Sequence, residues 1–282
     1  MRLLRTFSVL AVLICLVPAA PAQNCTPRVP ASSLVEAGKW QMSINPTLPP
    51  QQFVDDKGEL QGLNVELARE IAKRICIEPV FLRMDFPPMI PGLRAGRFDT
   101  INTGLFWTEE RSKMLYLVPY AQQAISIYTD PASSLKLEKF EDLAGRVVGV
   151  EAATYQERKA REFNTAMVAK GLKEIEFRTF TTVTATSAAL RAGQLEAALN
   201  INETANSLEQ RGIAKIWVRD IAGTDITFAF RDKLLAQAAA DALTEIRADG
   251  TYDKLFDKFN GAAIRRAHFD ARTVFELTVP EQ

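Results

Sequence analysis

The sequence predicts an α/β protein of two lobes, in which each lobe has a mostly parallel sheet with flanking helices. Two observations support this fold class. Strand-like segments alternate with segments of helical periodicity from residue 39 to about 104, and the same alternation runs again from about 131 to 220. An alternating apolar segment follows each block, "YAQQAISIYTD" and "DITFAFRDK", and we expect both to cross between the lobes as hinges. The expected boundaries are 23–126 for the first part of lobe 1, 127–224 for lobe 2 and 225–282 for the return to lobe 1.

The first block contains three expected strands, "KWQMSIN", "PVFLRM" and "RFDTINTG". Between the first two, "NVELAREIAKRI" places apolar residues at helical spacing, and Asn64 is its expected N-cap. "FPPMIPGLRAG" is expected to be a short helix that begins at its prolines and ends near Gly96. This alternating order is typical of a parallel sheet covered by helices.

The second block repeats this order. Its expected strands are "GRVVGVEA", "EIEFRTF", "QLEAALNI" and "AKIWVRD", and its expected helices are "TYQERKAREFNTAMVAKG", "TVTATSAALRAG" and "ETANSLEQRG". Two more helices, "LLAQAAADALTEIRADG" and "TYDKLFDKFN", follow the second crossover. In open sheets of this kind, ligands bind beyond the carboxyl ends of strands and near helix N-termini, where "FWTEER" and "AATYQE" lie.

The composition disfavours several classes of function. The 34 Lys and Arg residues balance 34 Asp and Glu residues, and no basic stripe with interleaved aromatics occurs, so we expect no nucleic-acid partner. The single histidine, His268, makes a structural zinc site improbable, and it leaves no Ser-His or Cys-His hydrolase unless His268 is the base. We therefore expect no metal and no cofactor.

The N-terminus has the features of an export signal. Arg2 and Arg5 flank the start of the apolar run "TFSVLAVLICLV", which is short for a membrane span, and "APA" at 20–22 has the form of a signal-peptidase site. We expect residues 1–22 to be a cleaved signal peptide and the mature protein to be periplasmic. The alternative is an uncleaved membrane anchor.

Removal of the signal leaves two cysteines, Cys25 and Cys76, in an oxidising compartment. A disulfide between them would tie the mature N-terminus to the end of a predicted helix. Two separate buried thiols are the alternative, because sequence does not show their geometry.

Six segments resemble, in order, motifs of one protein family. They are "GELQGLNVELAREIAKRI", "MIPGLRAGRFDTI", "TEERSKMLYLVPY", "GRVVGVEAATYQE", "LRAGQLEAAL" and "DITFAFRDKLL" with the later "EIRADGTYDKLFDKF". Over residues 39–259 the chain resembles the periplasmic solute-binding proteins of ABC importers, in the polar amino-acid-binding group (bacterial extracellular solute-binding protein family 3). The resemblance implies the type II periplasmic binding protein fold, with two lobes and two hinge crossovers.

The resemblance implies that Arg111 pairs with a ligand carboxylate, and an arginine fork matches the two oxygens of such a group. Thr108 is expected to cap the helix of Arg111, while Thr103 and Gly104 offer a hydroxyl and a close backbone approach.

Two further residues are expected at the ligand. Phe106 replaces what is often a small polar residue of the family, and Thr154 would complete the carboxylate site from the second lobe. The alternatives are a solvated or ion-paired Arg111, a Phe106 that packs in the core, and a Thr154 that only caps its helix.

The first departure from the family pattern concerns the aromatic residue that covers the ligand. In "TLPPQQF", Leu48 and Gln51 lie nearest to its place, and Phe53, Phe86 or Trp107 could substitute for it.

The second departure lies at the end of "LEAALNI", where the family has an Asp that pairs with the α-ammonium of the ligand. This chain has Ile201, followed by Asn202 and Glu203. A buried ammonium without a countercharge is costly. Either Glu203, Glu151 or Asp225 takes over, or the ligand carries no α-ammonium.

These observations predict a monomeric periplasmic receptor of an ABC transporter. It would capture a small polar carboxylate-bearing solute, an amino acid or a similar molecule, by hinge closure and deliver it to an inner-membrane ABC permease. We expect no enzymatic activity. The alternatives are a cyclic-carboxylate dehydratase type of enzyme that uses Glu151 or Glu203 as acid or base, and a sensing or interaction module.

Overall fold

The structure, a computed structural model, describes residues 25–259. The described helices are η1 (Ala31–Ser33), α1 (Leu63–Ile75), α2 (Met89–Arg94), α3 (Glu109–Ser112), η2 (Phe140–Leu143), α4 (Tyr155–Ala169), α5 (Val183–Arg191), α6 (Asn202–Gln210), α7 (Lys233–Ala248) and α8 (Thr251–Lys258). The described strands are β1 (Lys39–Ile44), β2 (Thr47–Leu48), β3 (Gln52–Val54), β4 (Leu60–Gln61), β5 (Glu78–Arg83), β6 (Thr100–Phe106), β7 (Tyr116–Thr129), β8 (Val147–Glu151), β9 (Glu176–Phe180), β10 (Ala197–Ile201) and β11 (Lys215–Phe230).

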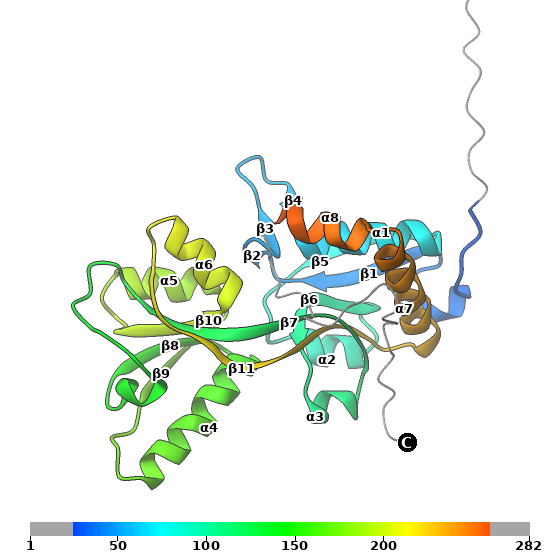
Figure 1. Cartoon of the computed structure of the whole chain (residues 1–282). Helices are drawn as coiled ribbons and strands as arrows, with labels where there is room; N and C mark the ends of the chain where they lie inside the picture. The colour runs from blue at the N-terminus through cyan, green and yellow to red at the C-terminus, as the bar shows by residue number, and fades with distance from the viewer. Residues whose placement is uncertain (1–24, 260–282) are drawn as a thin grey trace, which may run out of the picture.

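Eight strands form one sheet in the order β5-β1-β6-β11-β7-β10-β8-β9, and β2, β3 and β4 form a small antiparallel sheet. β1 pairs in parallel with β5 and β6, and β8 pairs in parallel with β9 and β10. Two long antiparallel strands, β7 and β11, join these parallel groups. Figure 1 shows both strands running from the part that holds α1, α2, α3, α7 and α8 to the part that holds α4, α5 and α6. The predicted α/β fold of mostly parallel sheets with flanking helices is confirmed.

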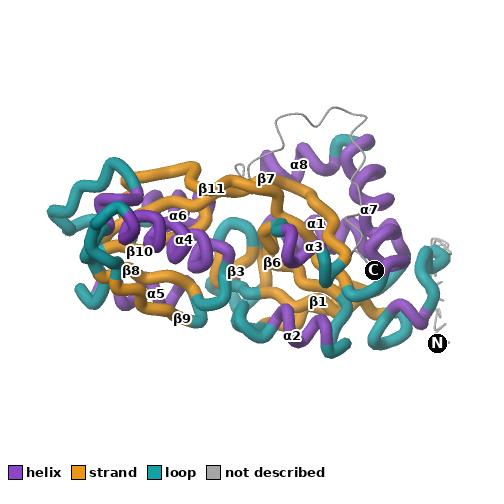
Figure 2. The backbone as a smooth tube through the Cα atoms, turned by 90° about the horizontal axis from the view of Figure 1, so that it is seen from below, coloured by secondary structure: helices purple, strands orange, loops and turns teal. Residues whose placement is uncertain are grey.

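The two connecting strands depart from regular pairing in their middle. The register between β11 and β7 shifts from Val218 to Ile221 and again from Ile221 to Thr224. In this stretch Asp220 and Ala222 have φ values of 61° and 50°, which residues other than glycine seldom adopt. Figure 2 shows β7 and β11 passing together between the two halves of the molecule. The irregular stretch of β11 therefore lies where the chain connects those halves.

Two details of the predicted elements need correction. α1 begins at Leu63, and its N-cap is Gly62 with a φ of 124°, so the expected cap at Asn64 was wrong. A Cβ atom at position 62 would lie 2.2 Å from the carbonyl oxygen of Gln51, and glycine is therefore required there. "AKIWVRD" and "DITFAFRDK" were expected as separate strands, but both belong to the single strand β11.

A buried carboxylate fixes the start of β6. Asp99 is fully buried and accepts hydrogen bonds from the backbone nitrogens of Val35 (2.8 Å) and Gln41 (2.9 Å). It also pairs with Arg231 at 3.0 Å, just beyond the end of β11. These contacts tie the N-terminal segment, β1 and β11 to the strand that leads into the site.

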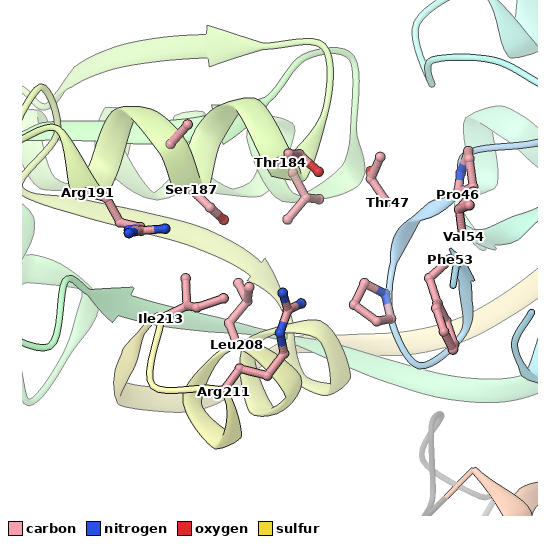
Figure 3. A pocket seen from close by; sticks show the side chains of 13 residues that line it. Pro46, Thr47, Phe53, Val54, Thr184, Ser187, Arg191, Leu208, Arg211 and Ile213 are labelled. Atoms are coloured by element: carbon pink, nitrogen blue, oxygen red, sulfur yellow. The ribbon is translucent and has the colours of Figure 1, made fainter. Parts of the chain in front are cut away.

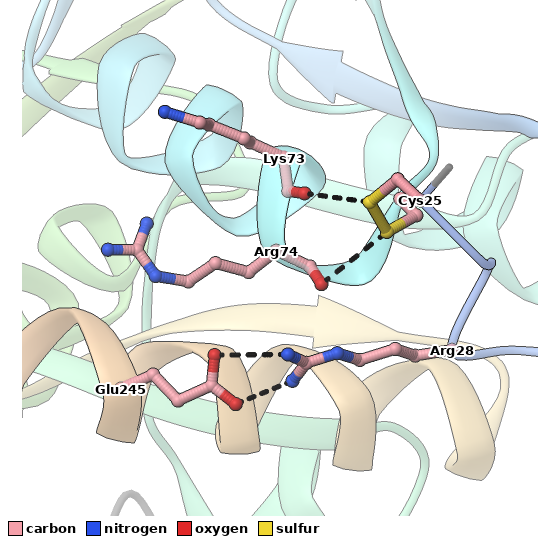
Figure 4. Close-up of a disulfide and its surroundings, with 6 residues drawn as sticks. Cys25, Arg28, Lys73, Arg74 and Glu245 are labelled. Atoms are coloured by element: carbon pink, nitrogen blue, oxygen red, sulfur yellow. Dashed lines mark hydrogen bonds and ion pairs between the residues drawn. A yellow bond between two sulfur atoms is a disulfide. The ribbon is translucent and has the colours of Figure 1, made fainter. Parts of the chain in front are cut away.

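The segment that begins at Cys25 is joined to the end of α1 by a disulfide between Cys25 and Cys76, with a Cα–Cα distance of 5.6 Å (Figure 4). Close to it, the guanidinium of Arg28 donates to both carboxylate oxygens of Glu245 on α7, at 2.6 and 3.3 Å. The expected signal peptide and the tail after residue 259 lie outside the described residues. Between residues 25 and 259, no helix is long and apolar enough to cross a membrane.

Candidate functional site

A small cavity of about 30 Å³ lies between the end of β6 and the start of α4. Its lining residues are Leu48, Phe86, Thr103, Gly104, Leu105, Phe106, Arg111, Glu151, Thr154, Tyr155, Gln156 and Ile201. These residues come from both halves of the molecule. A space of this size holds about one or two water molecules, so the walls are in a closed arrangement.

Arg111 places a buried positive charge in the wall of this cavity. Its Nη1 donates to the carbonyl oxygen of Phe106 at 2.8 Å, and its guanidinium lies 6.0 Å from the ring centroid of Phe86. Among the residues that the structure describes, no carboxylate forms an ion pair with it. Burial lowers the pKa of Arg111 to about 10, with a smaller contribution from nearby Arg158, so the side chain is charged at neutral pH. A guanidinium has five N–H donors, and most of these remain available to an anion in the cavity.

A chain of hydrogen bonds fixes the hydroxyl of Thr103. The hydroxyl of Tyr120 donates to Asn64, Asn64 donates to Gln52, and Gln52 donates to Thr103 Oγ1, at 2.7, 2.7 and 2.8 Å. Because Thr103 Oγ1 accepts the last of these bonds, its own hydrogen can be donated into the cavity. Asn64 does not cap α1, because its side chain belongs to this buried chain of hydrogen bonds.

Gly104 follows Thr103 with a φ of 69°, and it also lines the cavity. A Cβ atom there would meet the hydroxyl of Tyr120 at 3.4 Å. The left-handed backbone therefore favours glycine at this position, whereas the added Cβ would make only an ordinary van der Waals contact.

The opposite wall is formed by the first residues of α4. Thr154 caps this helix, because its Oγ1 accepts from the backbone nitrogen of Glu157 at 3.2 Å and donates to the carbonyl oxygen of Glu151 at 2.7 Å. Tyr155 stacks on Phe106, with ring centroids 4.5 Å apart and planes inclined by 13°. Since Phe106 ends β6 and Tyr155 begins α4, this stack closes the cavity from both sides.

Glu151 ends β8 and is only 4% exposed. Its Oε1 accepts a hydrogen bond from Asn45 Nδ2 at 2.7 Å, and Asn45 Oδ1 in turn accepts from Thr47 at 2.8 Å. Burial raises the pKa of Glu151 to about 8, with a smaller contribution from Asp85. Asn45 follows β1, so this hydrogen bond also joins the two halves of the molecule.

Seven of the ten ligand-binding residues predicted from the sequence line the cavity together: Leu48, Phe86, Thr103, Gly104, Phe106, Arg111 and Thr154. Three do not line it. Thr108 is used as the cap of α3, where its Oγ1 accepts from the backbone nitrogen of Arg111 at 3.1 Å. Asn202 bonds to Ser126 on β7 and Asp220 on β11, and Glu203 is buried at the start of α6.

Of the candidates for an aromatic cover, only Phe86 lines the cavity. Tyr155 and Gln156 also line it, although no role was predicted for them from the sequence. Glu151 was one of three open candidates for the partner of the ligand's ammonium. One signal pointed to Glu151: it is the only charged residue in the otherwise apolar strand "VVGVE".

A second, larger hollow of about 370 Å³ lies between residues 46–54 and helices α5 and α6 (Figure 3). Thr47, Pro49 and Phe53 line one wall, and residues of α5 and α6 line the other. Arg191 and Arg211 lie at this exposed groove. Thr47 and Pro49 thus line this groove, while Leu48 between them lines the small cavity.

Comparison with known proteins identifies related chains. The arginine-binding protein 1 of an Escherichia coli K12 ABC transporter is 25% identical over 232 residues, which cover 79% of this chain and 91% of the relative. An ancestral arginine-binding protein, solved bound to glutamine, is 30% identical with a TM-score of 0.72 over 79% of this chain and 98% of its own. An ancestral amino acid-binding protein, described as a precursor of cyclohexadienyl dehydratase, is 26% identical with a TM-score of 0.70 over 79% and 95% of the two chains. The model of one family matches residues 41–262. The chain therefore belongs to the bacterial extracellular solute-binding proteins, family 3.

Proposed function

We propose that this protein binds a small polar solute through its carboxylate at Arg111, as an amino acid or amino-acid-like ligand. The observation that carries the proposal is the environment of Arg111, which is 8% exposed and has no ion-pair partner among the described residues. A buried charge without a partner is unfavourable, and a ligand carboxylate would supply the missing one. The relatives support this ligand class, because their names give arginine or amino acids as ligands.

The second half of the molecule contributes donors to the same anion. The first backbone N–H groups of a helix have no partner within the helix, and the helix dipole favours negative charge there. α4 begins at Tyr155, beside the cavity and opposite Arg111. A carboxylate between Arg111 and the start of α4 would therefore be held from both sides.

Ligand entry requires the halves to separate, because a cavity of about 30 Å³ is too small for an amino acid. We place the hinge boundaries at 126/127 within β7 and at 224/225 within β11, and the irregular stretch of β11 supports this placement. When the halves close on a ligand, the rings of Tyr155 and Phe106 would cover that ligand as well as contact each other. Hinge closure around a buried ligand is the usual mechanism of such receptors.

The protein would work in the periplasm, after export by the signal at 1–22, as a monomer that delivers its solute to an inner-membrane ABC permease. We also propose that the protein has no enzymatic activity. Micromolar binding requires about 8 kcal/mol. Charge-assisted hydrogen bonds of about 1.5–3 kcal/mol each, together with the apolar cover, can supply it.

A thermal-shift screen of wild type with the twenty common L-amino acids tests the ligand class, because a ligand that binds only the native state raises the melting temperature. Isothermal titration of the best ligand then compares wild type with Arg111→Met and Arg178→Met. Arg178 is an exposed arginine of β9 and serves as the matched control. We expect about 100-fold weaker binding in Arg111→Met and no change in the control. Equal affinities in all three proteins would refute the role of Arg111.

A second candidate is an enzyme of the cyclic-carboxylate dehydratase type. The observation that favours it is Glu151, a buried carboxyl whose raised pKa of about 8 suits a general acid at neutral pH. Incubation with prephenate and arogenate, followed by chromatography of the products, separates the two functions. Turnover that Glu151→Gln abolishes would support the enzyme, and recovery of both compounds unchanged would support pure binding.

A further inference from the structure

The site has a positive group for a carboxylate, but the position expected to hold the ligand's ammonium is apolar. Ile201 ends β10 and lines the cavity, 3% exposed, where it can offer no negative charge. A zwitterionic ligand buried beside Ile201 would need a carboxylate from elsewhere. Three acidic residues are near enough in sequence or space to be considered: Glu203, Asp225 and Glu151.

Two of these three residues lie outside the cavity lining. Asp225 is on β11, where it accepts a hydrogen bond from Gln122 on β7 at 2.9 Å. Glu203 is buried in the first turn of α6, beyond Ile201. Neither belongs to the walls of the cavity that Arg111 lines.

Glu151 is placed differently. It lines the same cavity as Arg111 and Ile201, and its exposed fraction is only 4%. Oε1 accepts from Asn45, while Oε2 has no hydrogen-bond partner among the described residues. Within the described chain, no ion pair joins Glu151 to Arg111. The cavity wall therefore carries one acidic and one basic side chain that do not neutralise each other.

We propose that Glu151 is the counterion of the ligand's α-ammonium, and that the site is therefore selective for zwitterionic amino acids over simple carboxylates. This inference rests on the proposed function, because it takes Arg111 as the carboxylate partner. Asn45 is a positioning residue: it fixes the Glu151 carboxylate from the opposite half of the molecule, so the ammonium site is complete only when the halves are closed.

The protonation of Glu151 fits this role. Without a ligand, burial favours the neutral carboxyl, and Asp85 adds repulsion of the same sign. Arg111 is the other charged residue in the lining of the cavity. An ammonium placed between them would favour the ionised carboxylate, so binding of a zwitterion would release a proton.

The test compares amino acids with analogues that lack only the ammonium. The probe pairs are L-glutamine with glutaramate, L-arginine with 5-guanidinopentanoate, and L-phenylalanine with 3-phenylpropionate. Isothermal titration at pH 8 measures each pair with wild type, with Glu151→Gln and with Glu203→Gln, which makes the same change at another buried glutamate. Wild type and Glu203→Gln should prefer the amino acid about tenfold or more, and Glu151→Gln should lose that preference while its affinity for the analogue stays within about threefold.

The outcomes separate this inference from the proposed function. If wild type binds both members of a pair equally, or if Glu151→Gln keeps the preference, Glu151 is not the counterion, although Arg111 can still hold the carboxylate. A loss of preference in Glu203→Gln instead would assign the role to that residue and overturn the inference. If wild type binds no probe, the proposed function fails and the inference fails with it.

Should Glu151→Gln not fold, the wild-type protein alone provides the test. Titration at pH 7 in buffers of different ionisation enthalpy should show proton release with the amino acid and none with its analogue. Equal proton release for both members of the pair would overturn the inference.

Discussion

Proton release on ligand binding is a quantitative consequence of the environment of Glu151. With a pKa of about 8, the Glu151 carboxyl is about 90% protonated at pH 7 and about half protonated at pH 8 in the free protein. If the bound ammonium requires the carboxylate, binding releases about 0.9 proton at pH 7 and about 0.5 at pH 8. The binding constant should follow the ionised fraction, so affinity should rise about ninefold from pH 6 to 7 and about fivefold from pH 7 to 8.

The assay is isothermal titration with the best-binding L-amino acid in phosphate, HEPES and Tris at each pH. The slope of the observed enthalpy against the ionisation enthalpy of the buffer gives the number of protons exchanged. Glu151→Gln should show a slope near zero and little pH dependence of affinity between pH 6 and 8. Tight binding to wild type with less than about 0.2 proton released at pH 7, or with proton uptake, would show that Glu151 does not ionise on binding.

Three further predictions concern stability. The raised pKa of Glu151 means that the folded protein binds its proton more tightly than the unfolded chain, so stability falls as pH rises from 4.5 toward 8, by at most about 5 kcal/mol. Urea unfolding at pH 5 and pH 8 gives the unfolding free energies of wild type and Glu151→Gln. The free energy of the variant relative to that of wild type should be higher at pH 8 than at pH 5. The same difference at both pH values would contradict this prediction. Replacing both Cys25 and Cys76 by serine should cost about 4 kcal/mol for a loop closed over 51 positions, measured by denaturant unfolding, whereas an unchanged midpoint would show that the disulfide constrains nothing. Asp99→Ala should lower the unfolding free energy by about 3–5 kcal/mol, because it removes the carboxylate partner of Arg231 and leaves two backbone donors unpaired. A loss below about 1 kcal/mol would contradict this role of Asp99.

Local patterns in the sequence predict much of the fold, because strands and helices carry their own periodicity. The order of strands and helices around Arg111 is visible in this way, and so is the grouping of Thr103, Gly104 and Phe106 at the end of one strand. One local detail was less accessible to prediction from the sequence. The start of α1 depends on a close backbone approach of Gln51 to Gly62, which no periodic pattern records.

Glu151 shows a second limit of prediction from the sequence, which concerns contacts between distant parts of the chain. Its hydrogen-bond partner, Asn45, is 106 positions away in the chain, and the two meet only because β7 and β11 bring the halves together. The sequence shows a single acid at the end of an apolar strand, but the burial that changes its pKa is a property of the closed structure. The same holds for the stack of Phe106 on Tyr155, since neither residue predicts the other.

The carboxylate-binding role of Arg111 is tested most directly by isothermal titration of wild type and Arg111→Met. The ligands are the best-binding L-amino acid and the corresponding amino-acid amide, which lacks the charged carboxylate. We predict that wild type prefers the amino acid by about 100-fold and that Arg111→Met binds both compounds with similar, weak affinity. A wild-type protein that binds the amide as tightly as the amino acid, or a variant that keeps the preference, would contradict this role of Arg111.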